Sequence, residues 1–128
     1  DSRTSAVSAV FFNYPDDMAL RGLPSVGSYE ATRHLAEVGP TRRIRHSIGG
    51  LRPGTTFLVE ILDWEHGNPA EAWYRLGSPV NPSRAETEYL RTAADALLRY
   101  PLTVPASGVL ELDVELLPWA VMSVRQLP

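Results

Sequence analysis

The chain has 128 residues, the usual size of one domain, and 44% of them are hydrophobic, which suffices for a single core. Its 12 basic and 15 acidic residues leave a net charge of −3, so neither nucleic acid nor an anionic membrane is expected as a partner. The sequence contains no cysteine, which excludes disulfides, thiolate metal sites and a cysteine nucleophile.

Neither a membrane span nor a signal peptide is visible. The apolar runs fall far short of the roughly 20 residues that cross a bilayer. The chain begins with Asp1 and not with Met. We therefore expect that an upstream segment was removed or that the chain is a piece of a longer polypeptide.

The N-terminal part predicts a strand followed by a loop. Residues 6–13 (AVSAVFFN) are rich in strand-forming types, and a turn at 13–17 ends them. Residues 21–27 contain two Gly and one Pro and predict a loop. A short surface helix is expected over 28–38, with Ser28 as its N-cap and a stop at the following Gly-Pro pair.

The middle of the chain predicts two strands and a long irregular segment. Residues 42–48 give a weak strand pattern, and residues 55–63 (TTFLVEILD) a stronger one with apolar side chains on both faces. Residues 64–82 carry many Gly, Pro and Asn residues. Loops of this length in compact domains are usually functional or packed against a partner.

The C-terminal part predicts one clear helix and two strands. Ser83 and Glu86 form a capping box, and an apolar stripe at helical spacing continues through Leu98 until Pro101 ends it. Residues 109–116 alternate between apolar and acidic residues, as in a half-solvated antiparallel strand, and residues 120–127 predict a final strand.

These elements predict an all-β fold. About five to seven strands do not alternate with helices, which argues against a doubly wound parallel sheet. We predict a single domain over residues 1–128: a mainly antiparallel, immunoglobulin-like or jelly-roll-like β-sandwich with one well-defined helix and a long loop. An open barrel is the main alternative.

The densest group of ionisable residues is Asp63-Trp64-Glu65-His66, at the end of a predicted strand. It suggests an acid–base pair or part of a metal site, but a polar turn in which Asp63 accepts backbone hydrogen bonds is favoured. No metal-ligand spacing of histidines, nucleophile elbow or phosphate loop is present, so no metal is expected. The predicted strand over 109–116 carries three further carboxylates, which are better explained as its solvated face: Glu111, Asp113 and Glu115.

Aromatic residues near the long segment allow two interpretations. Trp64, Trp73 and Tyr74 would stack on sugar rings if the domain bound carbohydrate. The favoured interpretation is that Trp73 anchors the loop onto the sandwich and that Trp119 covers one end of it.

One stretch has a recognisable pattern: VEILDWEHGNPAEAWYRLGSPVNPSRAETEYLRTAADAL resembles the C-terminal region of family-39 glycoside hydrolases, the β-xylosidases and α-L-iduronidases. That region has a strand ending in Asp, a His-Ser-Asn-like turn, a Trp, a Met/Leu-Gly-Ser-Pro run and a helix led by Pro-Thr/Ser. Gly67 departs from the usual Ser. IGGLRPG and FFNYPDD resemble the family's Gly-Leu-Pro-Pro-Gly turn and Trp-Asn-Tyr strand end. The matching residues of the main stretch are Asp63, His66, Asn68, Trp73, Leu76, Gly77, Ser78, Pro79, Pro82 and Ser83.

The resemblance implies an accessory sandwich beside a catalytic (β/α)₈ barrel of the same polypeptide, an O-glycosyl hydrolase. The family's acid/base Glu follows an Asn, and this chain has no Asn-Glu pair and about half the length of a barrel, so no catalytic residue and no cofactor are expected. The residues expected to dock on the barrel or its cleft are Asp63, Trp64, Glu65, His66, Asn68, Trp73, Gly77 and Pro79.

Other functions stay open at this stage. A carbohydrate-binding module would use Trp64, Trp73 or Tyr74, and a small independent enzyme would use Asp63, Glu65 and His66. The resemblance also implies that a strand from the N-terminus of a full-length family member completes the sandwich. Without it, a homodimer through the exposed strand edge is expected.

Overall fold

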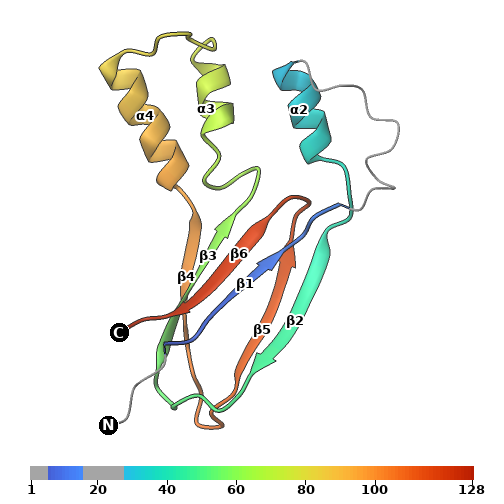
Figure 1. Ribbon diagram of the computed structural model, residues 1–128, viewed down its shortest axis with the longest axis vertical. Helices are drawn as coiled ribbons and strands as arrows, with labels where there is room; N and C mark the ends of the chain where they lie inside the picture. Colours follow the sequence, from blue (N-terminus) through green and yellow to red (C-terminus); the bar gives the residue numbers. More distant parts are fainter. Residues whose placement is uncertain (1–5, 16–27) are drawn as a thin grey trace.

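A computed structural model describes residues 6–15 and 28–128, and in them the chain forms six strands and three helices (Figure 1). The strands are β1 (Ser8–Phe12), β2 (Arg42–Ile48), β3 (Thr56–Leu62), β4 (Leu98–Thr103), β5 (Leu110–Leu116) and β6 (Val121–Gln126). The helices are α2 (Tyr29–Ala36), α3 (Pro69–Arg75) and α4 (Arg84–Asp95).

The strands form two antiparallel sheets. The larger sheet has the order β1-β6-β3-β4, and β2 pairs with β5 in the smaller one. The predicted all-β, mainly antiparallel sandwich is therefore confirmed.

The core lies between the inner faces of the two sheets. Because side chains alternate along a strand, every second residue of β3, β5 and β6 points inward. Burial of each large apolar side chain stabilises the fold by about 1.5–3 kcal/mol. The buried residues of these strands are Phe57, Val59, Ile61, Leu110, Leu112, Leu116, Met122 and Val124.

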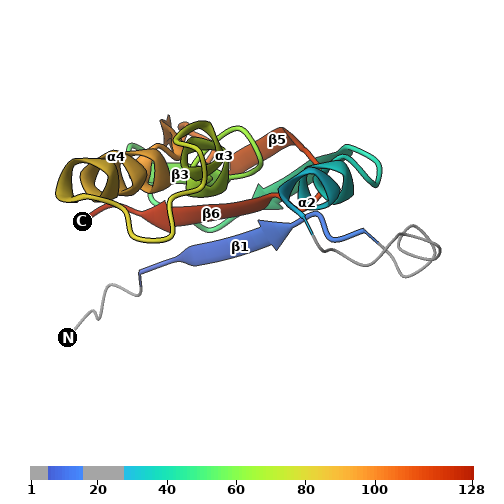
Figure 2. The same ribbon diagram turned by 90° about the horizontal axis from the view of Figure 1, so that it is seen from above.

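All three helices lie at one end of the sandwich, where β1 and β3 finish and β6 begins (Figures 1 and 2). Helix α2 connects β1 with β2, and helices α3 and α4 connect β3 with β4. This helical end therefore collects the segments that the sequence analysis singled out.

The structure differs from the predicted elements in the segment between β3 and β5. Residues 64–82 include the helix α3, whereas the many Gly, Pro and Asn residues of this segment predicted an irregular loop. Pro69 instead occupies the first turn of α3, where its missing N–H costs nothing, and Asn68 provides the N-cap.

The predicted helix from Ser83 begins as expected but ends at Asp95, and Leu98 already belongs to β4. That strand was missed because it contains Pro101. Pro101 is tolerated there because β4 is an edge strand and one side of it needs no donor. The predicted loop at 21–27 and the end of the predicted turn at 13–17 lie outside the described residues.

Asn13, directly after β1, ties the two sheets together. Its side chain is buried, and its Nδ2 donates to the carbonyl oxygens of Pro40, at 2.8 Å, and Leu116, at 3.0 Å. Its backbone N–H donates to the Ala120 carbonyl, and its carbonyl accepts from the N–H of Trp119. One residue thus links the ends of β1 and β5 with the start of β6.

Replacing Asn13 should therefore destabilise the sandwich. Asn13→Ala leaves two inward carbonyls without a donor, and we expect the free energy of unfolding to fall by about 1–3 kcal/mol in urea titrations. Asn13→Asp should cost more, because it places a carboxylate oxygen against those carbonyls. Asn81→Ala, at an exposed position, is the control. An Asn13→Ala variant as stable as this control would contradict the role assigned to Asn13.

Candidate functional site

The turn that follows β3 is organised by the carboxylate of Asp63, which is only 8% exposed. Asp63 Oδ1 accepts the backbone N–H groups of Glu65, at 2.8 Å, and His66, at 2.7 Å, and His66 Nδ1 lies 2.9 Å from the same oxygen. The Asp63 N–H donates to the His66 carbonyl. This is the polar turn favoured by the sequence analysis, with the His66 ring held against the carboxylate.

A polar hollow of about 360 Å³ opens beside this turn, between α3, α4 and α2. Trp64 contributes an indole surface, and Glu65 and Arg33 contribute charged groups. Arg75 Nε lies 3.1 Å from Glu71 Oε1, so these two charges offset each other. The remaining lining residues are Gly67, Asn68, Ala72, Tyr89, Ala93 and Ala96.

A second depression of about 350 Å³ is mostly apolar and runs between the sheet and α2. We call it the tryptophan groove, because Trp64 and Trp119 both line it. The indole N–H of Trp119 donates to the Leu35 carbonyl at 3.0 Å, which seats α2 on the end of the sandwich. The other lining residues are Ala36, Leu62, Asp63, Gly67, Asn68, Pro69 and Pro118.

The two carboxylates of the Asp63–His66 cluster face different depressions. Glu65 lines the polar hollow, whereas Asp63 lines the tryptophan groove. Asp63 Oδ1 accepts two backbone N–H groups and lies beside His66 Nδ1. Glycoside hydrolysis usually requires two carboxylates that flank one bond. The turn therefore does not place Asp63 and Glu65 as such a pair.

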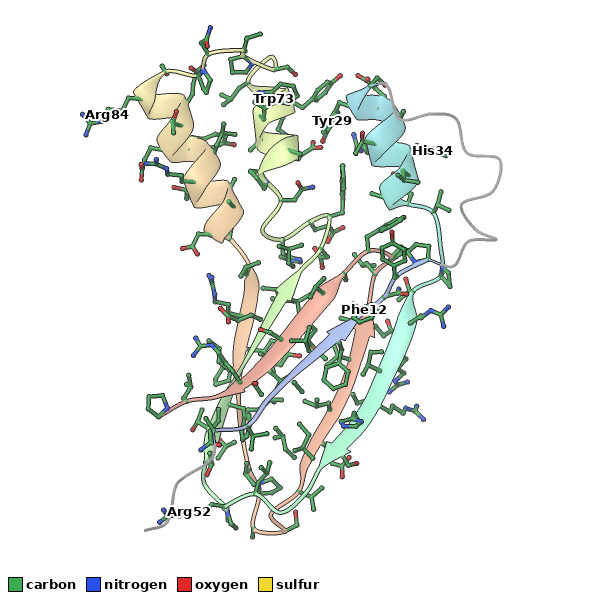
Figure 3. The ribbon with its side chains drawn as sticks, viewed as in Figure 1. Phe12, Tyr29, His34, Arg52, Trp73 and Arg84 are labelled. Carbon is green, nitrogen blue, oxygen red and sulfur yellow. The ribbon has the colours of Figure 1, made fainter. Side chains whose placement is uncertain are left out.

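Helices α2 and α3 are joined by a reciprocal contact that the sequence analysis did not predict, and we call it the tyrosine clasp. The Tyr29 hydroxyl donates to Glu71, and the Tyr74 hydroxyl donates to Glu30 Oε1 at 2.7 Å. The two rings stack with their centroids 4.2 Å apart. Figure 3 shows Tyr29 in the space between the two helices. No local sequence pattern predicts this contact, because the partners in each hydrogen bond are more than 40 positions apart in the chain.

The clasp shifts the titration of its members. Burial, followed by the hydrogen bond to Glu71 and the charge of Glu71, raises the pKa of Tyr29 to about 12. The hydrogen bond from Tyr29 lowers the pKa of Glu71, and the hydrogen bond from Tyr74 lowers the pKa of Glu30. The hydrogen bond to Glu30 raises the pKa of Tyr74.

The outer part of the 64–82 segment is held by Trp73. Its indole N–H donates to the Pro79 carbonyl at 3.2 Å, and its own carbonyl accepts from the Ser78 N–H. Gly77 has a φ of 83°, a left-handed conformation that Gly adopts without strain. Trp73 thus fixes the loop after α3 to its own helix, whereas the sequence analysis expected it to anchor the loop onto the sandwich.

The structure therefore divides the predicted site residues into two groups. Asp63, Trp64, Glu65, His66 and Asn68 lie at the base of α3, where Asn68 Oδ1 accepts from the Ala70 N–H and its Nδ2 donates to the Trp64 carbonyl. The residues Trp73, Gly77 and Pro79 lie at the far end of that helix, and Tyr74 joins the clasp.

The strand carboxylates form a solvated face, as the sequence analysis favoured. Arg43 pairs with Asp113 across β2 and β5, and Ser47 donates to Glu111. Among residues 6–15 and 28–128, no three His, Asp or Glu side chains gather into a group that could hold a metal ion. Within the same ranges, no helix has the length and apolar character to cross a membrane.

Comparison with solved structures defines the class of protein that has this fold. The chain superposes on part of a GH39 enzyme from Xanthomonas axonopodis pv. citri, with a TM-score of 0.67 and 20% identity. A monomeric β-xylosidase from Caulobacter crescentus CB15 gives a TM-score of 0.58 at 15% identity. These matches cover 96% and 98% of this chain but 24% of each solved chain. The fold is thus that of one part of family-39 glycoside hydrolases.

Two further similar proteins are iduronidases. A bacterial orthologue of human α-L-iduronidase matches with a TM-score of 0.51 and 23% identity, over 70% of this chain and 17% of that one. In sequence, 64 residues are 41% identical to the α-L-iduronidase of Canis lupus familiaris, which is 50% of this chain and 10% of that protein. No protein-family profile matches the chain. The resemblance predicted from the sequence is confirmed, and the chain corresponds to a small part of these glycosidases.

The shifted pKa values make the stability of the clasp depend on pH. The pKa of Tyr29 is raised from 10.0 to about 12 in the folded state. Its contribution to the free energy of unfolding is therefore complete below pH 10 and is lost as the pH rises through 12. The pKa of Glu71 is lowered from 4.5 in the folded state. Its contribution to the free energy of unfolding is therefore present above pH 4.5 and is lost as the pH falls through the folded-state pKa.

We therefore expect Tyr29→Phe to reduce the free energy of unfolding most between pH 4.5 and pH 10, and to have a smaller effect at lower or higher pH. Urea titrations across pH measure this difference, and phenolate absorbance should lose its latest-titrating component. Tyr89→Phe, at a side chain that is 50% exposed, is the control. A Tyr29→Phe effect that does not change with pH would contradict the assigned pairing.

Proposed function

We propose that this chain is a non-catalytic C-terminal domain of a glycoside hydrolase that resembles β-xylosidases and α-L-iduronidases. It stabilises the catalytic (β/α)₈ barrel of the same polypeptide and shapes the rim of the active site. The observation that carries the proposal is the size of the match, because nearly the whole chain superposes on only a quarter of larger family-39 enzymes.

The helical end suits a docking surface because its parts are already fixed. Asp63 holds the turn, Asn68 caps α3, and the clasp and the Trp73 anchor hold the helix and the following loop. A surface that is ordered before binding avoids the entropic cost of ordering on contact. The residues proposed to meet the barrel or its cleft are Asp63, Trp64, Glu65, His66, Asn68, Trp73, Gly77 and Pro79.

The chemistry of the helical end also favours a supporting role. One oxygen of the Asp63 carboxylate is held by the turn, and Asp63 does not line the same depression as Glu65. The active site of the parent enzyme would lie in the barrel, which has about twice the length of this chain. A small independent enzyme built on Asp63, Glu65 and His66 is therefore not favoured.

The pure chain should hydrolyse neither β-xylosides nor α-L-iduronides. Chromogenic and fluorogenic substrates, followed for many hours at high protein concentration, test this directly. Turnover that disappears in an Asp63→Ala variant would contradict the proposal. Asn81→Ala is the matched control, because it removes an exposed polar side chain away from the turn.

A carbohydrate-binding module is the second candidate, and the polar hollow favours it. An indole surface beside charged and amide groups is a typical sugar-binding arrangement, and Trp64 provides that surface next to Arg33 and Glu65. Trp73 and Tyr74 are less suited, because Trp73 holds the loop and one face of Tyr74 is covered by Tyr29.

Affinity gels distinguish the two candidates. If the chain is a binding module, soluble xylan should retard it, and Trp64→Ala should remove the retardation while Trp119→Phe keeps it. On the favoured proposal, xylan leaves the mobility of the chain unchanged even at high polymer concentration. A retardation that Trp64→Ala abolishes would replace the favoured proposal with the second.

We also infer a homodimer through a strand edge as an arrangement of the isolated chain. Strands β1, β2 and β5 each have a single neighbour, so each leaves one row of backbone groups unpaired by a strand, whereas the β4 edge is interrupted by Pro101. Sedimentation velocity tests this, since a strictly monomeric profile at high concentration would argue against edge pairing.

A further inference from the structure

We propose that the outer face of the larger sheet, next to the helical end, is covered by a helix of the catalytic part of the same glycosidase polypeptide. We call this surface the apolar corner and define it as Val10, Phe12, Leu62 and Val121. The inference rests on the proposed function and adds a docking face that lies outside the 64–82 segment.

The strand register places these side chains together. Phe12 of β1 pairs with Val121 of β6, and Val121 pairs in turn with Leu62 of β3. Directly paired residues point to the same face of a sheet, and the neighbours Met122 and Ile61 point into the core. Val10 lies two positions before Phe12 and therefore on the same outer face.

All four side chains of the apolar corner are exposed. Phe12 is 67% exposed and Val10 63%, while Leu62 and Val121 are 46% and 41% exposed. Figure 3 shows Phe12 at the end of β1, just below the helices. A contiguous exposed apolar patch on a small domain commonly marks an interaction surface.

The rest of the same sheet face is charged, which sets the corner apart. Farther from the helices, Glu60 pairs with Arg99 at 2.9 Å and with Arg125 at 3.3 Å. These ion pairs give that region the ordinary character of a solvated sheet face. The change from ion pairs to uncharged side chains falls within a few residues along β3 and β6, so the corner has a defined boundary.

The corner continues into the tryptophan groove. Leu62 belongs to both, and from there the groove leads past Pro69 and Pro118 to Trp64 and Trp119. The apolar surface therefore extends from the sheet face to the base of α3. It joins the new docking face to the first group of predicted docking residues.

The width of the corner and the length of the solved relatives favour a helix of the catalytic part as the occupant. The row Phe12–Val121–Leu62 crosses three strands, which is roughly 10 Å at about 4.8 Å per strand spacing. That width matches the roughly 10–12 Å diameter of an α-helix. In the similar solved structures, about three quarters of the chain lies outside this fold. A (β/α)₈ barrel presents an outer ring of helices, whose side chains would cover the corner.

The test compares hydroxyl-radical oxidation of Phe12 in the isolated chain and in a polypeptide that also carries the catalytic barrel. Phe12 should be oxidised readily in the isolated chain and protected in the longer polypeptide. Phe12→Asp should leave the Tm of the isolated chain nearly unchanged but lower the Tm and shorten the activity half-life of the longer polypeptide. Ser107→Asp adds the same charge in an exposed turn at the opposite end and should change neither.

The outcomes separate this inference from the proposed function. Equal oxidation of Phe12 in both proteins, with glycosidase activity present, would overturn the inference alone. Protection of Phe12 already in the isolated chain, together with a dimeric sedimentation profile, would make a second copy the occupant and would also overturn it. A folded longer polypeptide without glycosidase activity would overturn the proposed function instead.

Discussion

The buried carboxylate of Asp63 is the constraint on which the helical end depends. It stands directly after β3, and two backbone N–H groups and the His66 ring converge on one of its oxygens. Hydrogen bonds to a charged group contribute roughly 1.5–3 kcal/mol each, so the shape of the turn is held firmly. This turn places Trp64 where it lines both the polar hollow and the tryptophan groove. It also sets the position of Asn68, the N-cap of α3. A residue that resembles a catalytic acid in the sequence thus acts as the foundation of a rigid surface.

The same rigidity explains how a small domain could serve a large enzyme. The sandwich supplies a core that needs no disulfide. Helices α2 and α3 at its end are joined to each other by the tyrosine clasp, and α2 is joined to the sandwich by Trp119. A partner that docks on such a surface does not have to order it first. The polar hollow, the tryptophan groove and the apolar corner all lie around this end. The surface there therefore changes from charged to apolar across neighbouring elements. That gradient fits a contact with protein better than a cleft that performs hydrolysis.

The sequence predicted those elements that neighbouring residues determine by themselves. The capping box is present in full, with both the Ser83 and the Glu86 hydrogen bonds, and the alternation of β5 buries Leu110, Leu112 and Leu116 as expected. Helix α3 and strand β4 were missed because each contains a proline whose tolerance depends on position: the first turn of a helix in one case and the edge of a sheet in the other. The clasp could not be predicted, since it joins segments far apart in the chain. The apolar corner is likewise a product of strand register, which only the assembled sheet reveals.

The most direct measurement of the central claim follows the indole N–H resonances of the three tryptophans while xylose, xylo-oligosaccharides and a uronic acid are added. Trp73 and Trp119 donate their indole N–H groups to carbonyls within the chain, so they report on the integrity of the fold. Trp64 lines the polar hollow and reports on any ligand there. If the helical end serves to contact protein, none of the three resonances should move in a saturable way. A saturable shift of the Trp64 resonance, with the other two unchanged, would show that the hollow binds sugar by itself and would contradict this account.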